Sequence, residues 1–124
     1  MIQFKRIDHI HICVAPEKLE QARVFYTDVI GLELIERPNH LFKTAGYWFN
    51  IADIQLHIGV EPTLPPSTRH TAFEVEDVDT ARKYLDGKVE ILEEPAIPGR
   101  RRFAFRDPFG NRIELLQKIW ELFF

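Results

Sequence analysis

The chain has 124 residues, 45% hydrophobic and 28% charged, which suits one ordinary globular domain. Its 16 basic and 19 acidic residues give a net charge of −3, which argues against nucleic-acid binding, because that role usually needs a basic surface. No apolar run approaches the roughly 18 residues of a membrane span, and the charged N-terminal decapeptide does not resemble a signal peptide.

Cysteine usage favours a reducing compartment. Cys13 is the only cysteine, so no disulfide can form within the chain. We therefore expect a cytoplasmic protein.

The first part of the chain, about residues 1–60, predicts one βαβββ module. Strand-like alternation near the N-terminus places His9, His11 and Cys13 on one face. A proline that opens a helix and a glycine that ends one then mark an amphipathic segment. The expected elements are a strand at 5–14, a helix from Pro16 to Gly31, and strands at about 32–37, 46–50 and 54–60.

The second part of the chain, about residues 70–117, repeats this order after a proline-rich connector at 61–69. Asp77 is the expected N-cap of its helix. The expected elements are strands at 70–76, 89–94, 101–107 and 111–117, and a helix at 77–87; an apolar tail, 118–124, follows. One such module cannot cover its own sheet, so we predict an α+β fold in which two tandem βαβββ modules form a half-open barrel within a single domain.

The repeat assigns four equivalent positions, His9, Gln55, His70 and Glu114. His9 precedes Gln55 by 46 positions, and His70 precedes Glu114 by 44. If the strands are neighbours in curved sheets, these side chains share one cavity, where two imidazoles and a carboxylate can hold a divalent metal with open coordination positions. Taken singly, each histidine is also compatible with a hydrogen-bonded structural role, and Glu114 with a solvent-facing strand position.

Five segments carry a family resemblance that covers nearly the whole chain: DHIHICV, ARVFYTDVIGLEL, GYWFNIADIQLHIGVE, RHTAFEVEDVDTAR and RRFAFRDPFGNRIELL. With them the chain resembles the vicinal oxygen chelate superfamily, which includes glyoxalase I, extradiol dioxygenases, fosfomycin resistance proteins and bleomycin-binding proteins. The resemblance implies a metal-centred cup with ligands at the positions of His9, His70 and Glu114, and commonly a homodimer. In glyoxalase-like members the position of Gln55 holds an acidic ligand that also shuttles a proton.

Gln55 departs from that pattern, because an amide does not titrate usefully. His57 lies two residues further on and faces the same side of the predicted strand. We therefore predict His57 as a fourth ligand or an acid/base group with a near-neutral pKa, alongside Gln55, although a hydrogen-bonded strand histidine remains an equal alternative.

The predicted pocket is aromatic and partly apolar, which suits a small oxygenated organic molecule. About half of the aromatic side chains on the flanking strands should face inward, and an arginine there could bind a carboxylate, although a plain surface charge is also compatible with the pattern. The predicted substrate-binding residues are His11, Tyr47, Trp48, Phe103 and Arg102.

Three functions follow from this interpretation. The first is a metal-dependent, glyoxalase-like lyase or isomerase, the second a one-domain extradiol-type dioxygenase, and the third a metal-free, bleomycin-type binding protein. No thiolate belongs to the ligand set, so Zn, Ni, Fe, Mn and Co all remain candidates. We expect a homodimer with the tail 118–124 near the interface, and no nucleic-acid or membrane partner.

Overall fold

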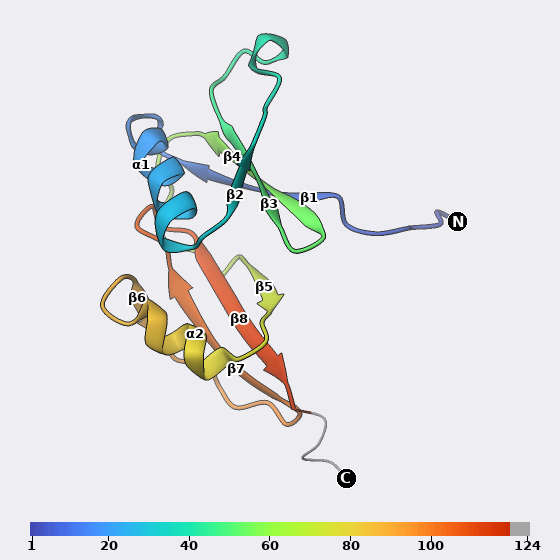
Figure 1. Ribbon diagram of the computed structural model, residues 1–124, viewed down its shortest axis with the longest axis vertical. Coiled ribbons are helices and arrows are strands. Elements are labelled where there is room, and N and C mark those ends of the chain that lie inside the picture. Colours follow the sequence, from blue (N-terminus) through green and yellow to red (C-terminus); the bar gives the residue numbers. More distant parts are fainter. Residues whose placement is uncertain (120–124) are drawn as a thin grey trace. The chain divides into compact units, whose positions relative to one another are not determined.

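The computed structural model describes residues 1–119, which divide into two compact units, one ending at Leu64 and the other beginning at Pro65 (Figure 1). Each unit carries one four-stranded sheet and a helical segment. The division falls within the proline-rich stretch 61–69, which holds no helix or strand. The predicted α+β fold with two tandem βαβββ modules is confirmed.

The first unit has the strand order β1-β4-β3-β2. Its strands are β1 (His9–Val14), β2 (Glu33–Ile35), β3 (Tyr47–Ile51) and β4 (Ile54–Val60). β1 and β4 are parallel, with His9 beside Gln55 and His11 beside His57, and the other pairs are antiparallel. Because laterally paired side chains share a face, these four polar residues lie on one side of the sheet.

The helix expected from Pro16 to Gly31 is built from three conformations. It comprises a 3₁₀ turn, η1 (Pro16–Lys18), then α1 (Leu19–Val24), then a π-helical turn, η2 (Phe25–Val29); a further 3₁₀ turn, η3 (Asn39–Leu41), lies in the loop that follows β2. Gly31 follows with a φ of 85°, a left-handed conformation that glycine adopts without steric cost. The helical segment buries Ala22, Phe25 and Tyr26, and Tyr26 packs against Phe49 of β3.

The second unit has the strand order β5-β8-β7-β6. Its elements are β5 (His70–Glu74), α2 (Val78–Leu85), β6 (Glu90–Leu92), β7 (Arg100–Arg106) and β8 (Arg112–Lys118). Asp77 caps α2, as predicted, by accepting a hydrogen bond from the Thr80 amide at 3.1 Å. The carboxylate of Asp107 closes the β7–β8 turn by accepting from the amides of Phe109 and Asn111.

Each sheet has one apolar face and one polar face. In each unit the apolar face lines a core of its own. The most deeply buried large side chains are Tyr26, Phe49, Ile58 and Val14 in the first unit, and Phe103 and Phe105 in the second. Full burial of one such side chain contributes roughly 1.5–3 kcal/mol. His57 follows Leu56 in β4, and Glu114 follows Ile113 in β8. Because successive side chains of a strand point to opposite faces, His57 and Glu114 lie on the polar faces, although both are buried.

Among residues 1–119, no helix combines the length and the apolar character that crossing a membrane requires. The apolar tail predicted at 118–124 lies almost entirely outside the described residues.

Candidate metal centre

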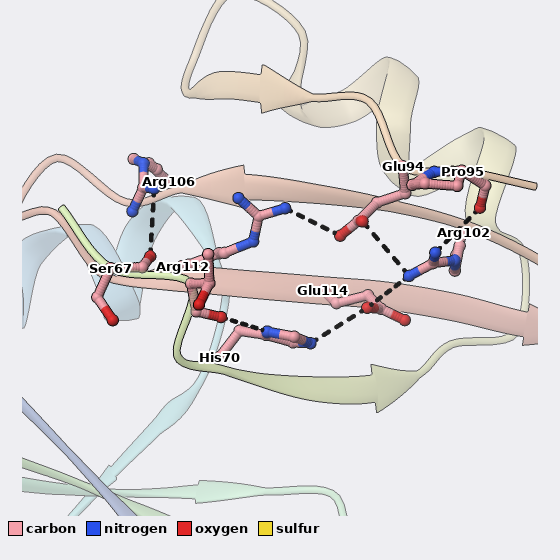
Figure 2. A network of polar contacts seen from close by, with 9 residues as sticks. Ser67, His70, Glu94, Pro95, Arg102, Arg106, Arg112 and Glu114 are labelled. Atoms are coloured by element: carbon pink, nitrogen blue, oxygen red, sulfur yellow. Dashed lines mark hydrogen bonds and ion pairs between the residues drawn. The ribbon is translucent and has the colours of Figure 1, made fainter.

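His70 and Glu114 lie together on the polar face of the second unit. His70 begins β5, and Glu114 pairs with Ala72, two residues further along that strand. The His70 Nε2 atom is 3.4 Å from Glu114 Oε1, and Figure 2 shows the ring and the carboxylate pointing toward one another. Glu114 is only 4% exposed, so this carboxylate is held largely away from solvent.

The imidazole of His70 is held by its other nitrogen. Nδ1 donates a hydrogen bond to the Thr68 backbone carbonyl at 2.8 Å. A neutral imidazole then keeps its lone pair on Nε2, the atom that faces Glu114. Two electron-rich atoms that face each other in this way are bridged favourably by a cation, and a backbone carbonyl on the second nitrogen is the usual support of a metal-binding histidine. The donor pair therefore fits a divalent metal.

Arg102 reaches the same carboxylate from β7. Its Nη1 donates to Glu114 Oε1 at 3.1 Å and lies 3.4 Å from Glu94 Oε2, while its Nη2 donates to the Pro95 carbonyl at 3.0 Å (Figure 2). Arg112 Nη2 completes the cluster at 3.2 Å from Glu94 Oε1. Arg102, predicted to bind a substrate carboxylate, is thus engaged by carboxylates of its own chain.

Three aromatic rings stack on the polar face of the first unit. The His57 ring lies between His9 and Trp48, with centroid distances of 4.0 Å and 4.2 Å. His57 Nε2 donates to Gln55 Oε1 at 2.9 Å, because an amide oxygen only accepts. His9 Nδ1 likewise donates to the Asp8 carboxylate at 2.8 Å, which leaves the His9 lone pair on Nε2.

His57 does not have the near-neutral pKa predicted from its residue type. Burial is the main cause that lowers the pKa of this imidazole to about 4, and the neighbouring His9 and His11 contribute to the same shift. His57 is therefore uncharged at neutral pH. The burial of His57 depends on the rings of His9 and Trp48, which belong to other strands, so the sequence of β4 alone does not indicate it.

His11 lies on the same face as His9, as predicted, and its Nε2 is 3.5 Å from Cys13 Sγ. A Cβ at Gly59 would come within 2.7 Å of the His11 ring, so glycine is needed at this position for the ring to lie across β4. Burial raises the pKa of the Cys13 thiol, which keeps it protonated at neutral pH.

Two predicted pocket residues lie on the opposite faces of their sheets. Tyr47 shares the face of Phe49, and its hydroxyl donates to Glu20 of the helical segment at 2.6 Å. Phe103 is 1% exposed and has the Arg82 guanidinium of α2 above its ring at 5.7 Å. Both were assigned to the wrong face, whereas Trp48 pairs with His57 and lies on the polar face of the first unit.

Taken unit by unit over residues 1–119, no three His, Cys, Asp or Glu side chains form a group that could hold a metal ion. The structure brings His70 and Glu114 together in one unit, and places His9, Gln55, His57 and His11 together in the other. Sequence reasoning missed the supporting contacts made by Asp8, Thr68, Glu94 and Arg112.

Two βαβββ units, each with a histidine at the start of its first strand and a polar residue facing it from the last, define a protein of glyoxalase-like fold. The chain belongs to the Glyoxalase/Bleomycin resistance protein/Dioxygenase superfamily, whose family model matches residues 6–115. The predicted resemblance to vicinal oxygen chelate proteins is thereby confirmed.

Solved structures agree with this assignment. A protein described as a glyoxalase family member from Bacillus anthracis is 36% identical, with a TM-score of 0.84 over 96% of this chain and 99% of that one. The fosfomycin resistance protein FosX from Listeria monocytogenes is 22% identical, with a TM-score of 0.77 over 96% and 98%. Lactoylglutathione lyase from Agrobacterium tumefaciens is 20% identical, with a TM-score of 0.70 over 90% and 92%. The last two likenesses establish the fold alone.

Proposed function

We propose that this chain is a metal-dependent enzyme that binds a small organic molecule through two adjacent oxygen atoms. The observation that carries the proposal is the approach of His70 Nε2 to Oε1 of the buried Glu114 at 3.4 Å, with the second nitrogen of His70 occupied by a backbone carbonyl. Arg102 donates to the Glu114 oxygen, but a metal cation can bind that oxygen and the His70 lone pair together when the imidazole is neutral.

The proposed ligands are His70, Glu114 and His9, with the third supplied by the first unit of the same chain or of a second copy in a homodimer. His9 supports this role because its Nδ1 donates to Asp8, which leaves Nε2 as the donor atom. Two nitrogens and one carboxylate suit Mn, Fe, Co, Ni or Zn. When bound, such a cation polarises substrate oxygens and stabilises negative charge on them. One FosX structure is a complex with Mn(II), so Mn²⁺ is the first metal to test.

We assign proton transfer to His57, positioned by Gln55. Because His57 Nε2 donates to Gln55, the lone pair of the uncharged ring is on Nδ1. The ring is uncharged at neutral pH, because its pKa is about 4, so Nδ1 can accept a proton. This chemistry favours a glyoxalase-like lyase or isomerase. Trp48 and His11 would border the same polar face and contact the substrate.

Metal content tests the ligand assignment directly. Protein purified without chelators should contain one divalent metal per site, and His9→Ala, His70→Ala and Glu114→Ala should each remove most of it. His40→Ala is the matched control, because His40 is an exposed histidine of η3 in the loop before β3. Equal metal content in all four variants and the parent protein would refute the ligand set.

Activity tests the reaction type separately. The metal-loaded protein should convert a hemithioacetal formed with one of several thiols, and His57→Gln should lower kcat. Failure with every thiol and metal would remove the lyase assignment, and oxygen uptake with catechols would then support the dioxygenase alternative. Sedimentation at micromolar concentration tests the homodimer, which, like the cytoplasmic location, stays a prediction.

A further inference from the structure

Arg102 contacts the proposed metal ligand Glu114 and a second carboxylate at the same time. Its Nη1 lies 3.1 Å from Glu114 Oε1 and 3.4 Å from Glu94 Oε2. The Glu114 oxygen that it binds is also the one that faces His70 Nε2. A cation bound between His70 and Glu114 would therefore compete with Arg102 for one oxygen atom.

The metal-free cluster is balanced in charge and shielded from solvent. Two arginines, Arg102 and Arg112, face two glutamates, Glu94 and Glu114, and the four side chains are only 13%, 18%, 10% and 6% exposed. A buried charge that loses its partner is strongly destabilised, so an ionised Glu114 needs a counter-cation whether or not a metal is present. Arg102 supplies that charge, and Glu94 offers it a partner when Glu114 is taken.

We propose that Arg102 is a positioning residue that holds Glu114 beside His70 in the metal-free protein and exchanges Glu114 for Glu94 when a divalent cation binds. This inference rests on the proposed function, because it takes Glu114 as a ligand. The planar guanidinium suits the exchange, since it can pivot between two carboxylates while Nη2 keeps its hydrogen bond to the Pro95 carbonyl.

The test is a titration of the full-length, metal-free protein with Mn²⁺, in which free Mn²⁺ is measured by electron paramagnetic resonance. Arg102→Gln should bind Mn²⁺ about tenfold more tightly than the parent, because the competitor for Glu114 is gone. Arg112→Gln is the matched control: it removes an equal and similarly shielded charge, whose ion pair is with Glu94. We expect the Mn²⁺ affinity of Arg112→Gln to differ from that of the parent by less than about threefold, because only the loss of a nearby positive charge acts on it.

A second variant keeps the charge constant. Arg102→Lys retains the positive charge but loses the fork that contacts Glu114, Glu94 and Pro95 together, so it should tighten Mn²⁺ binding by about threefold. If circular dichroism shows that Arg102→Gln does not fold, Arg102→Lys decides the question. In the metal-free state, both variants should also melt at a lower temperature than the parent.

Equal tightening by Arg102→Gln and Arg112→Gln would overturn the proposal, because charge alone would then explain the effect. Weaker binding by either Arg102 variant would also overturn it, since Arg102 would then be needed in the metal-bound state. If the parent protein binds no Mn²⁺ and no other divalent metal, the proposed function itself fails and the inference fails with it.

Discussion

The buried imidazole of His57 makes the stability of the protein depend on pH in a defined window. An unfolded chain protonates this histidine near its ordinary pKa of 6.5, whereas the folded chain does so only near 4. Between these pH values the unfolded state binds more protons than the folded state, so the free energy of unfolding rises with pH. The contribution of the uncharged His57 is therefore lost as the pH falls from 6.5 to about 4. Replacing His57 with phenylalanine keeps a ring between His9 and Trp48 and removes the titration.

The size of the effect follows from the pKa difference. A pKa that falls from 6.5 to about 4 corresponds to about 3 kcal/mol, the most that this one group can remove from the free energy of unfolding on acidification. Since single domains are stable by only about 5–15 kcal/mol, that loss is a large fraction of the total.

Urea unfolding followed by far-UV circular dichroism at pH 7, 6, 5 and 4 measures the window. Between pH 7 and pH 4 the His57→Phe variant should lose about 3 kcal/mol less stability than the parent. His40→Phe, the same change at an exposed loop histidine, should follow the parent curve. If His57→Phe and the parent lose equal stability, burial of the uncharged imidazole is not what lowers its pKa, and the reasoning is wrong.

Three further predictions concern backbone spacing, a turn and the support of a ligand. Gly46→Ala should lower the free energy of unfolding by about 2 kcal/mol in urea, because the new Cβ would lie 2.6 Å from the Ile58 carbonyl oxygen. Asp107→Ala should lower it by a similar ~2 kcal/mol, because two half-buried amides of the β7–β8 turn lose their acceptor, and Asp107→Asn should lower it less. Asp8→Ala should leave unfolding unchanged yet weaken Mn²⁺ binding by about tenfold in the resonance titration, because His9 loses the acceptor that fixes its Nδ1 proton.

The fold was predictable because the sequence repeats its local signals. Alternation, helix-opening and helix-ending residues and the proline-rich connector occur in the same order in both parts of the chain. Two details were not predictable. β1 begins at His9 rather than at residue 5, and the first helix changes conformation twice along its length. Periodicity does not distinguish 3₁₀, α and π turns in so short a segment.

The pairing within the candidate site was only partly predictable. The repeat of the two modules suggested that His70 lies beside Glu114 as His9 lies beside Gln55. His9 does pair with Gln55, but His70 pairs with Arg112, and Glu114 lies two residues further along β8. The sequence does hold a signal for the Arg102 contact. The five-residue turn DPFGN aligns residue 106 with residue 112, which places residue 102 opposite residue 116. Arg102 is therefore a diagonal neighbour of Glu114 on the adjacent strand.

The faces of Tyr47 and Phe103 depended on the phase of each strand. Once His57 is placed on the polar face, the antiparallel register puts Trp48 beside it and Tyr47 on the other side. The same argument places Phe103 on the face opposite to Glu114, because Ala104 is the residue that pairs with Glu114. The pKa of His57 could not be derived in this way, since it depends on how closely two rings from other strands cover the imidazole.

The parallel pairs β1–β4 and β5–β8 also govern the order in which each unit can assemble. Ribosomal synthesis produces the strand that bears His9 or His70 first, but its hydrogen-bonding partner is the last strand of the same unit. Each of these pairs closes a loop that spans nearly the whole unit, and such long closures slow folding. We therefore expect the two histidine-bearing strands to join their sheets late, after the intervening hairpin has formed, so that neither polar face is complete until its unit has been fully translated.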